Sequence, residues 1–265
     1  MVSTFDELGS DSTIVDDPAE TLTRPGCLLP VVQVVVPAAG EGTRMGELAA
    51  NRPKGLVDVA GKPLLARVFE AVLPLDVEEL LVVVARRDGP IADRFGPSYC
   101  GTPIRYVHQP EPRGLGHAVL TAEPHVDGDF AVVNGDNAVD ADLGPVLDHH
   151  REATPAATLP VEAVSPAVAR ETGVAVVEDG RVRAVVEKSD DPPSDLALTG
   201  VFVLPPAMFD ALQLATPSAR GELELSDAID LLARGGHRVD AVEFPGWRLN
   251  VNTPADVEAA ADRFR

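Results

Sequence analysis

Small residues and two cations follow the first strongly apolar run of the chain. Val34–Val36 has the character of a buried parallel strand, and the run stops at Pro37. Glycine and alanine in such a loop let a ligand approach the backbone N–H groups closely, which suits phosphate. Arg44 offers a planar fork of donors and Lys54 a compact charge for phosphate oxygens. The loop residues expected to contact a nucleotide are Ala38, Ala39, Gly40, Gly42 and Thr43.

Two common phosphate-binding motifs are missing from this segment. It has no G-x-x-x-x-G-K-[ST], and no G-x-G-x-x-G with an acidic residue about 20 positions later. The sequence G-x-G-T-R, followed by R-P-K-G-L and G-K-P-L-L, closely resembles the start of the sugar-phosphate nucleotidylyltransferases. That family includes glucose-1-phosphate thymidylyltransferases and the uridylyltransferases of glucose-1-phosphate and N-acetylglucosamine-1-phosphate.

The resemblance implies nucleotidyl transfer between a nucleoside triphosphate and a sugar-1-phosphate. A phosphate oxygen of the sugar would attack the α-phosphorus in line, and pyrophosphate would leave. Such chemistry depends on positioning and charge neutralisation more than on a covalent nucleophile. The resemblance implies that Arg44 contacts the triphosphate and stabilises the leaving pyrophosphate, and that Lys54 neutralises the α-phosphate region. Lys62, between Gly61 and Pro63, is expected to support the loop or form a salt bridge.

A Mg²⁺ ion should bridge the phosphates on a few carboxylate or amide oxygens. Asp136, in N-G-D-N, follows a predicted buried strand, where the sites of α/β proteins gather, and is the best candidate ligand. Thymidylyltransferases have an aspartate at the position of Asn250, whereas N-acetylglucosamine-type uridylyltransferases use an asparagine that maps to Asn252. An amide oxygen neutralises no charge, so either asparagine predicts a weaker metal site, and the two remain alternatives.

The segment after the third predicted strand is assigned to the nucleobase by the resemblance. Gln109 would hydrogen-bond the pyrimidine edge, and Gly114 would offer its backbone to the base. A side-chain amide both donates and accepts, so it can read the imide of uracil or thymine. The string G-L-G-H-A-V-L-T-A that begins at Gly114 looks most like uridylyltransferases. His117 within it is interpreted as a capping or packing residue and is given no catalytic role.

The sugar phosphate is assigned to the second half of the chain, again by resemblance. Gly173 would let the sugar approach the backbone, Glu187 would bind sugar hydroxyls, and Lys188 would bind the sugar phosphate. Thr199, beside Gly200, resembles the next sugar-contacting segment. Lys188 is the only lysine in the second half of the sequence, which favours a functional role.

Two departures from the family pattern keep alternatives open. Relatives often carry Pro-Leu-Thr before R-P-K, whereas this chain has a different segment, residues 45–51. The sequence P-K-G-L-V also resembles a motif of cytidylyltransferases that act on phosphocholine or other small alcohol phosphates. Because Asn250 and Asn252 stand where a carboxylate would bind metal strongly, a catalytically silent nucleotide-binding or sugar-phosphate-binding regulatory protein is the third reading.

Strands and helices alternate from residue 32 to residue 152, which predicts βαβ units and an α/β fold, and short strands with a hairpin turn follow from residue 159. The resemblance implies a Rossmann-like nucleotidyltransferase fold, with a mixed, mostly parallel central sheet flanked by helices and a small β-rich sugar-binding subregion. Strands are expected at 34–36, 80–84, 104–107, 130–133, 159–164, 173–177, 182–186, 198–204, 239–244 and 248–251. Helices are expected at 63–73, 91–95, 116–121, 143–152, 207–214, 225–234 and from a cap at Thr253.

Composition limits the remaining function classes. The 265-residue chain has a net charge of −20, which argues against nucleic acid and anionic membranes as partners. Residues 1–31 read as an acidic flexible tail, and residues 32–265 as one catalytic domain without a C-terminal β-helix. The scarcity of lysine and cysteine predicts a reduced cytoplasmic protein adapted to a salt-rich cell. The sequence sets no oligomeric state and is compatible with a homo-oligomer.

Overall fold

The computed structural model describes residues 33–40, 45–46 and 52–265. The predicted N-terminal tail, residues 1–31, lies outside the described residues. The same is true of three residues predicted to bind nucleotide, Gly42, Thr43 and Arg44.

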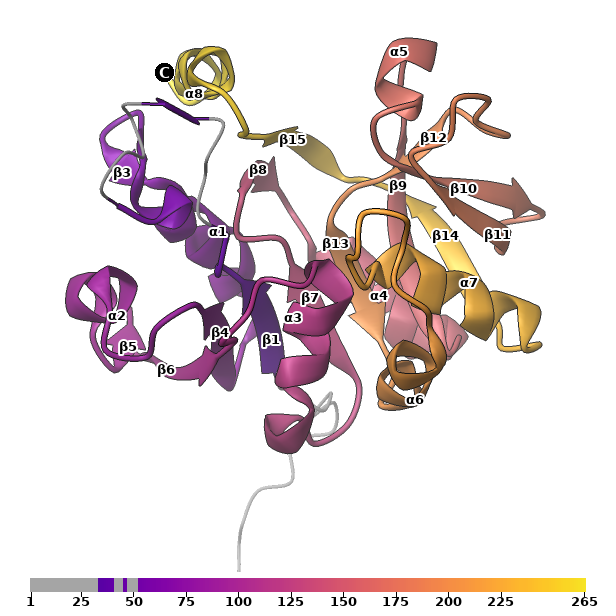
Figure 1. Ribbon diagram of the computed structural model, residues 1–265, viewed down its shortest axis with the longest axis horizontal. Helices are drawn as coiled ribbons and strands as arrows, with labels where there is room; N and C mark the ends of the chain where they lie inside the picture. Colours follow the sequence, from indigo (N-terminus) through magenta and orange to yellow (C-terminus); the bar gives the residue numbers. More distant parts are fainter. Residues whose placement is uncertain (1–32, 41–44, 47–51) are drawn as a thin grey trace, which may run out of the picture.

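In the described part of the chain, eleven strands form one mixed sheet (Figure 1). Their order across the sheet is β12-β10-β11-β14-β9-β13-β7-β1-β4-β6-β5. Their bounds are β1 (Gln33–Pro37), β4 (Glu79–Val84), β5 (Ser98–Tyr99), β6 (Thr102–His108), β7 (Phe130–Val133), β9 (Ala157–Ala163), β10 (Gly173–Glu178), β11 (Arg181–Glu187), β12 (Leu196–Leu198), β13 (Val201–Leu204) and β14 (Val239–Glu243).

The sheet has a parallel half and a largely antiparallel half. β6, β4, β1 and β7 are parallel neighbours, and their apolar runs are buried because helices cover both faces. Beyond β7, the pairs described are antiparallel except for β9 with β14. The expectation of a mostly parallel central sheet therefore holds only for the first half. The sequence-local hairpins of the second half, such as β10–β11, pair antiparallel because a short turn joins them.

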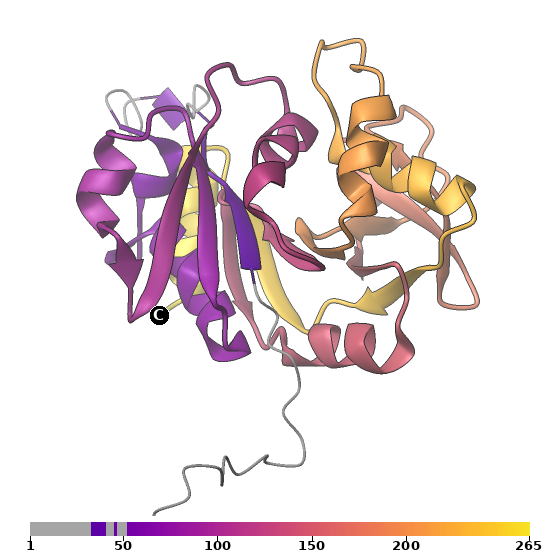
Figure 2. The same ribbon diagram turned by 90° about the horizontal axis from the view of Figure 1, so that it is seen from below.

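Helices lie on both faces of the sheet. Val34 and Val36 belong to one hydrophobic cluster and Val35 to another, because successive side chains of a strand point to opposite faces. The first cluster is covered by α1 and α4, and the second by α3, α6 and α7, which lie close together in Figures 1 and 2. The helices are α1 (Leu64–Val72), α2 (Pro90–Phe95), α3 (Leu115–Thr121), α4 (Gly144–Ala153), α5 (Pro166–Ala169), α6 (Ala207–Leu214), α7 (Leu225–Arg234) and α8 (Pro254–Arg263).

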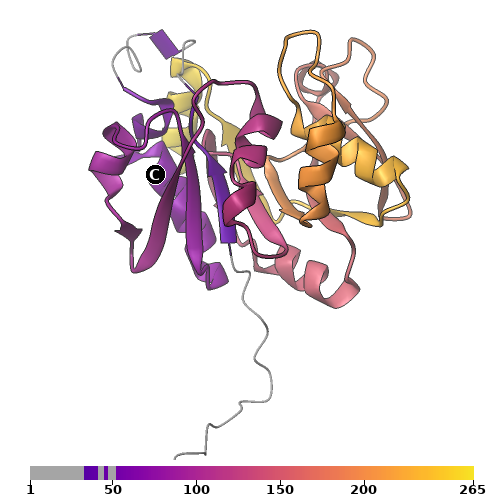
Figure 3. The ribbon, with the colours of Figure 1, turned by 60° about the horizontal axis from the view of Figure 1, so that its bottom comes forward.

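A separate two-stranded ribbon leads into α8, which packs against the small hairpin near the first strands. It pairs β8 (Asn137–Ala141) with β15 (Gly246–Asn250), while β2 (Asp58–Val59) and β3 (Lys62–Pro63) form a small hairpin. The helix α8 contacts β2 and β15, and Figure 3 shows this yellow helix beside the indigo segments. The third hydrophobic cluster fills the space between them. Thr253 and Asp256 form the capping box expected at the start of α8.

The predicted strand over 198–204 is divided in two. Gly200 has φ of +74°, a conformation that glycine adopts without the strain of other residues, so β12 ends before it and β13 begins after it. Alternation over 198–204 could not predict this break, because the flanking residues are apolar. No helix in the described part of the chain is long and apolar enough to cross a membrane.

Candidate active site

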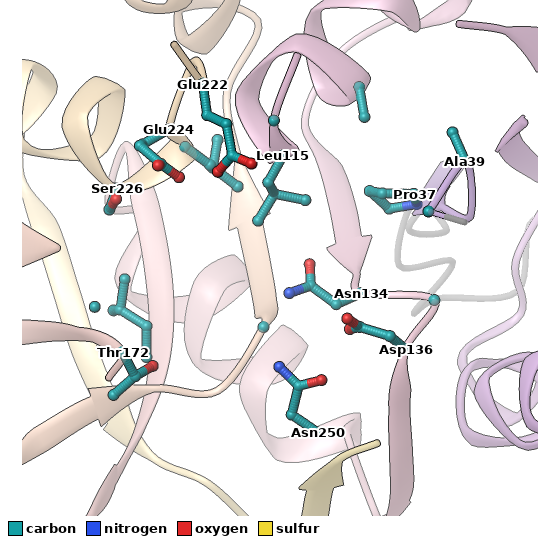
Figure 4. Close-up of a pocket in the computed structure, with 18 of the residues that line it drawn as sticks. Pro37, Ala39, Leu115, Asn134, Asp136, Thr172, Glu222, Glu224, Ser226 and Asn250 are labelled. Carbon is teal, nitrogen blue, oxygen red and sulfur yellow. The ribbon is translucent and has the colours of Figure 1, made fainter. Parts of the chain in front are cut away.

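A cavity of about 450 Å³ lies where the carboxyl ends of the parallel strands meet the antiparallel half of the sheet. Its walls include the segments that follow β1, β6 and β7, together with the starts of β10 and α7. Figure 4 shows Asn134, Asp136 and Asn250 pointing into the same space, with Glu222 and Glu224 on another wall. Open α/β sheets place ligand sites at this edge of the strands.

Most of the predicted site residues line this cavity. They come from five distant parts of the sequence, so the fold brings together what the motifs named separately. The predicted residues on its walls are Ala38, Ala39, Gly40, Lys54, Gln109, Gly114, Asp136, Gly173, Glu187, Lys188, Asn250 and Asn252.

Thr199 is the exception among the predicted residues that the structure describes. Its side chain is fully buried, and its hydroxyl donates a hydrogen bond to the carbonyl of Pro160 at 2.9 Å. It is therefore a structural residue between β12 and β9, and its assignment to the sugar is corrected. The neighbouring Gly200 lines the cavity instead.

Lys54 connects two segments on one side of the cavity. It opens a short 3₁₀-helix (Lys54–Leu56) and is only 9% exposed. Its Nζ donates to Asp136 Oδ2 at 2.9 Å and to Asn252 Oδ1 at 2.7 Å. Asp136 reaches this point because the backbone N–H of Gly135 donates to the carbonyl of Pro37, which ties the loop after β7 to the loop after β1.

The same two oxygens have the chemistry of a Mg²⁺ site. Asp136 Oδ2 and Asn252 Oδ1 both lie within hydrogen-bond distance of a single ammonium group, so they converge on one positively charged position. Mg²⁺ in phosphate-transfer sites is often held by one or two protein oxygens, with phosphate and water oxygens completing the octahedron. The described residues include no group of three or more His, Cys, Asp or Glu side chains that could hold a metal alone. The donor set therefore fits a metal ion shared with phosphates.

Asn252 is held in place by the cap of the last helix. Asp256 Oδ2 accepts from the backbone N–H of Asn252 at 2.8 Å and of Thr253 at 2.7 Å. Asn250, two residues earlier, also lines the cavity and is paired with Asn137 in the ribbon. Of the two alternatives for a metal ligand, Asn252 is the one whose side-chain oxygen shares a partner with Asp136.

The end of the cavity near α3 is built around a buried amide. Gln109 is 3% exposed, and its Nε2 lies 2.8 Å from His117 Nδ1. Burial lowers the pKa of His117, Arg113 lowers it further, and Glu111 opposes the shift. Gly114 has φ of +95°, and a Cβ built there would lie 2.7 Å from the carbonyl oxygen of Leu223, so only glycine fits.

Another part of the cavity wall carries a charged pair at the end of β11. Glu187 Oε1 lies 3.1 Å from Lys188 Nζ, and a Cβ built on Gly173 would lie 2.6 Å from Glu187 Oε2. The side chains of Glu187 and Lys188 are 17% and 37% exposed, so both can meet a ligand.

Several lining residues were not predicted from the sequence. Glu222 and Glu224 come from the segment before α7, where Arg220 Nη2 pairs with Glu224 Oε1 at 2.6 Å. The hydrogen bond with Glu224 raises the pKa of Arg220, and burial, together with Glu224 and Glu187, raises the pKa of Asp227. The sequence R-G-E-L-E, with three charges in five residues beside a predicted helix, is the signal that could have identified them.

A second buried cation supports the floor of the site. Arg248 in β15 pairs with Glu162 at 2.6 Å and donates to the carbonyl of Leu198 at 3.2 Å. Burial lowers the pKa of Arg248, while the negative charges of Glu162 and Asp136 oppose that shift.

Residues 33–256 match the family model described as nucleotidyl transferase. The chain belongs to the nucleotidyl transferase family. The resemblance seen in the G-x-G-T-R and R-P-K-G-L motifs is thereby confirmed, and so are the enzyme class and the family's fold of mixed α/β content.

Among curated relatives, this nucleotidyl transferase is 44% identical to the UTP–glucose-1-phosphate uridylyltransferase AglF of Haloferax volcanii, over 88% of this chain and 97% of the relative. It is 34% identical to a glucose-1-phosphate thymidylyltransferase of Streptomyces antibioticus, over 85% of this chain and 64% of the relative. A solved UDP-glucose pyrophosphorylase in complex with UDP-glucose superposes with a TM-score of 0.78 at 26% identity, covering 88% of this chain and 97% of that one.

Proposed function

We propose that this nucleotidyl transferase transfers a uridylyl group from UTP to a hexose-1-phosphate and releases pyrophosphate. The observation that carries the proposal is the convergence of Asp136 Oδ2 and Asn252 Oδ1 on Lys54 Nζ in the wall of the cavity. This cluster, Gln109 and the Glu187–Lys188 pair all line one cavity, so two phosphate-bearing substrates bound there could meet. The 44% identity to a UTP–glucose-1-phosphate uridylyltransferase favours UTP and glucose-1-phosphate.

The reaction is a single in-line displacement at phosphorus. A phosphate oxygen of the sugar-1-phosphate attacks the α-phosphorus, a new P–O bond forms, and the bond from the α-phosphorus to the β-phosphate bridging oxygen breaks. The electron pair leaves with pyrophosphate, and no proton need be removed from the nucleophile, because a phosphate oxygen is already anionic near neutral pH. Positioning and charge therefore supply most of the acceleration.

Each end of the cavity has a separate task in this proposal. Gln109 and the backbone at Gly114 bind the base, while Ala38, Ala39 and Gly40 present the loop backbone to the triphosphate. Lys54, and Arg44 by its motif position, neutralise phosphate charge. Gly173, Glu187 and Lys188 form the β-rich sugar subregion, with Lys188 directed at the sugar phosphate.

Asp136 and Asn252 would hold Mg²⁺, which neutralises phosphate charge when bound. Asn250 remains the alternative ligand. With Mg²⁺ held by these two oxygens, Lys54 would be released from them and would be available to the α-phosphate. Without the ion, the ammonium group balances the charge of Asp136 and occupies the position on which the two oxygens converge.

A substrate screen tests the proposal. UTP, dTTP, CTP and ATP are each paired with glucose-1-phosphate, N-acetylglucosamine-1-phosphate and phosphocholine, in Mg²⁺ with both high and low KCl, and pyrophosphate and the nucleotide product are measured. We expect turnover with UTP and glucose-1-phosphate, and none in a D136A variant. Product only from CTP and phosphocholine would establish the cytidylyltransferase instead, and nucleotide binding without pyrophosphate from any pair would establish the silent regulatory protein.

The same samples address the setting in which the protein works. We propose a cytoplasmic, salt-rich environment, because the net charge of −20 produces self-repulsion that salt screens. Activity and folding should then increase with KCl concentration. Light scattering on the same samples distinguishes a monomer from the homo-oligomer that the sequence leaves open.

A further inference from the structure

Gln109 is held by one side chain whose role the nucleotidyl-transfer chemistry does not require. His117 lies in the first turn of α3, eight residues after Gln109, and its Nδ1 is 2.8 Å from Gln109 Nε2. The backbone of Gln109 is fixed independently, because its N–H donates to the carbonyl of Val84 at 2.9 Å. The amide group itself is therefore oriented by its contact with the imidazole.

This contact has a defined direction. The amide Nε2 is a donor only, so Nδ1 of His117 must accept, and the imidazole must be neutral with its proton on Nε2. Burial and the guanidinium of Arg113 lower the pKa of His117, and Glu111 only partly opposes them, so the neutral form is favoured near neutral pH. Among the described residues, Gln109 Oε1 accepts no hydrogen bond from any partner, so this oxygen is available to a ligand.

The geometry of a primary amide decides what remains for a ligand. One Nε2 hydrogen lies on the same side as Oε1, and the other points away from it. If the hydrogen that points away is donated to His117, the edge formed by Oε1 and the remaining N–H is free. On that edge Oε1 can accept from N3–H of uracil, and the remaining Nε2–H can donate to a neighbouring carbonyl of the base.

We propose that His117 is a positioning residue that makes the active site favour uracil over cytosine by opposing rotation of the Gln109 amide. This inference rests on the proposed function, in which Gln109 contacts the base. Cytosine presents the reverse pattern, an acceptor at N3 and a donor at N4, and would match Gln109 only after the amide rotated by half a turn. That rotation would place Oε1 against the lone pair of His117 Nδ1, where two acceptors at 2.8 Å repel until the imidazole moves its proton from Nε2 to Nδ1.

Substitutions at His117 separate this role from simple packing. His117→Ala and His117→Leu both delete the acceptor, and His117→Asn keeps one, because an asparagine oxygen can occupy the position of Nδ1. His108→Ala is the matched control, since His108 is exposed and ends β6 immediately before Gln109. For each variant, kcat and KM are measured with UTP and with CTP, and folding is followed by circular dichroism.

We expect His117→Ala and His117→Leu to lower the ratio of kcat/KM for UTP to that for CTP by about tenfold to a hundredfold, the range for unpairing a buried hydrogen-bonding group. The change should come mainly from a higher KM for UTP and a lower KM for CTP. His117→Asn and His108→Ala should keep the wild-type ratio.

Two results would overturn the inference. One is an unchanged UTP-to-CTP ratio in whichever deletion variant is folded. The other is a loss in His117→Asn as large as that in His117→Ala, which would assign the effect to ring shape. A wild-type enzyme that does not prefer UTP would instead refute the proposed function, so the two failures can be told apart.

Discussion

Replacing Lys54 by methionine should remove most of the activity while the protein stays folded. Lys54 Nζ lies 2.9 Å from Asp136 Oδ2. The residue Lys54 is 9% exposed, so water screens its charge only partly. Two unit charges about 4 Å apart at an effective dielectric constant of about 20 interact by about 4 kcal/mol. Because each 1.4 kcal/mol or so of activation free energy corresponds to about a tenfold change in rate, loss of this charge at the α-phosphate should lower kcat by about a hundredfold to a thousandfold.

The response to Mg²⁺ separates the two tasks assigned to Lys54. Removing the ammonium group leaves both ligand oxygens without their shared donor, so the Mg²⁺ concentration needed for half-maximal activity should stay the same or fall. A pyrophosphate-release assay with saturating UTP and glucose-1-phosphate over a Mg²⁺ titration gives kcat and this concentration together. Denaturant unfolding of the same variant checks that the fold is intact, which is expected because the Asp136 side chain is 34% exposed and can be hydrated.

Lys62→Met is the control for the loss of a lysine. Lys62 lies in the neighbouring hairpin, is about half exposed, and pairs with Glu70 at 2.7 Å, away from the cavity. Its kcat should match that of the wild type. The reasoning fails if folded Lys54→Met retains nearly full kcat, or if Lys62→Met loses as much activity as Lys54→Met.

Three further predictions concern the scaffold around the cavity. Gly200→Ala should lower the free energy of unfolding by more than about 1 kcal/mol, because φ is +74° and a Cβ would lie 2.7 Å from two asparagine amide nitrogens; denaturant unfolding measures this. Asp256→Ala should destabilise the protein by about 1 kcal/mol through the lost cap and raise the Mg²⁺ requirement by loosening Asn252, which the Mg²⁺ titration reports. Burial raises the pKa of Asp240, but hydrogen bonds, led by the one from Arg238, outweigh burial and lower this pKa below the ordinary aspartate value. The ionised carboxylate therefore stabilises the fold above the ordinary pKa, and this stabilisation is lost as the pH falls through the lower pKa of the folded state. Asp240→Asn should accordingly make the free energy of unfolding fall less steeply with decreasing pH.

Each of these three has its own contradicting result. A Gly200→Ala protein of wild-type stability would mean that the turn between β12 and β13 can relax. An Asp256→Ala protein with an unchanged Mg²⁺ requirement would show that Asn252 does not depend on the cap. If Asp240→Asn leaves the acid limb unchanged, other carboxylates control acid unfolding.

The parallel half of the fold could be predicted from the sequence because its strands are continuous apolar runs. Burial on both faces requires such runs at β1, β4 and β7, and the pattern leaves little choice. The hairpin turn at Asp179 and Gly180 was also predictable, and both residues have positive φ there. The strand β8 was missed, because its five residues follow the N-G-D-N turn and pair with a segment more than a hundred positions away.

The candidate site was predictable only as far as the motifs extend. Glycines, Lys54 and Asp136 occur in short recognisable strings, and the fold brings those described together at the cavity. Thr199 was assigned wrongly because a sequence string does not say which way a side chain points. The contact of His117 with Gln109 was missed because a Pro/Gly-rich loop and the start of α3 lie between them, and no periodicity relates residues on either side of such a loop.

The hydrogen bond from Lys54 to Asn252 spans 198 positions of the chain. During synthesis from the N-terminus, the loop that carries Lys54 emerges first, and its second partner, Asn252, emerges 198 positions later. Contacts of such long range form late, because loop closure must precede them. A nascent chain that stops before Asn252 would therefore contain the strands of the main sheet and still lack this contact, so catalytic competence would report that synthesis had passed Asn252.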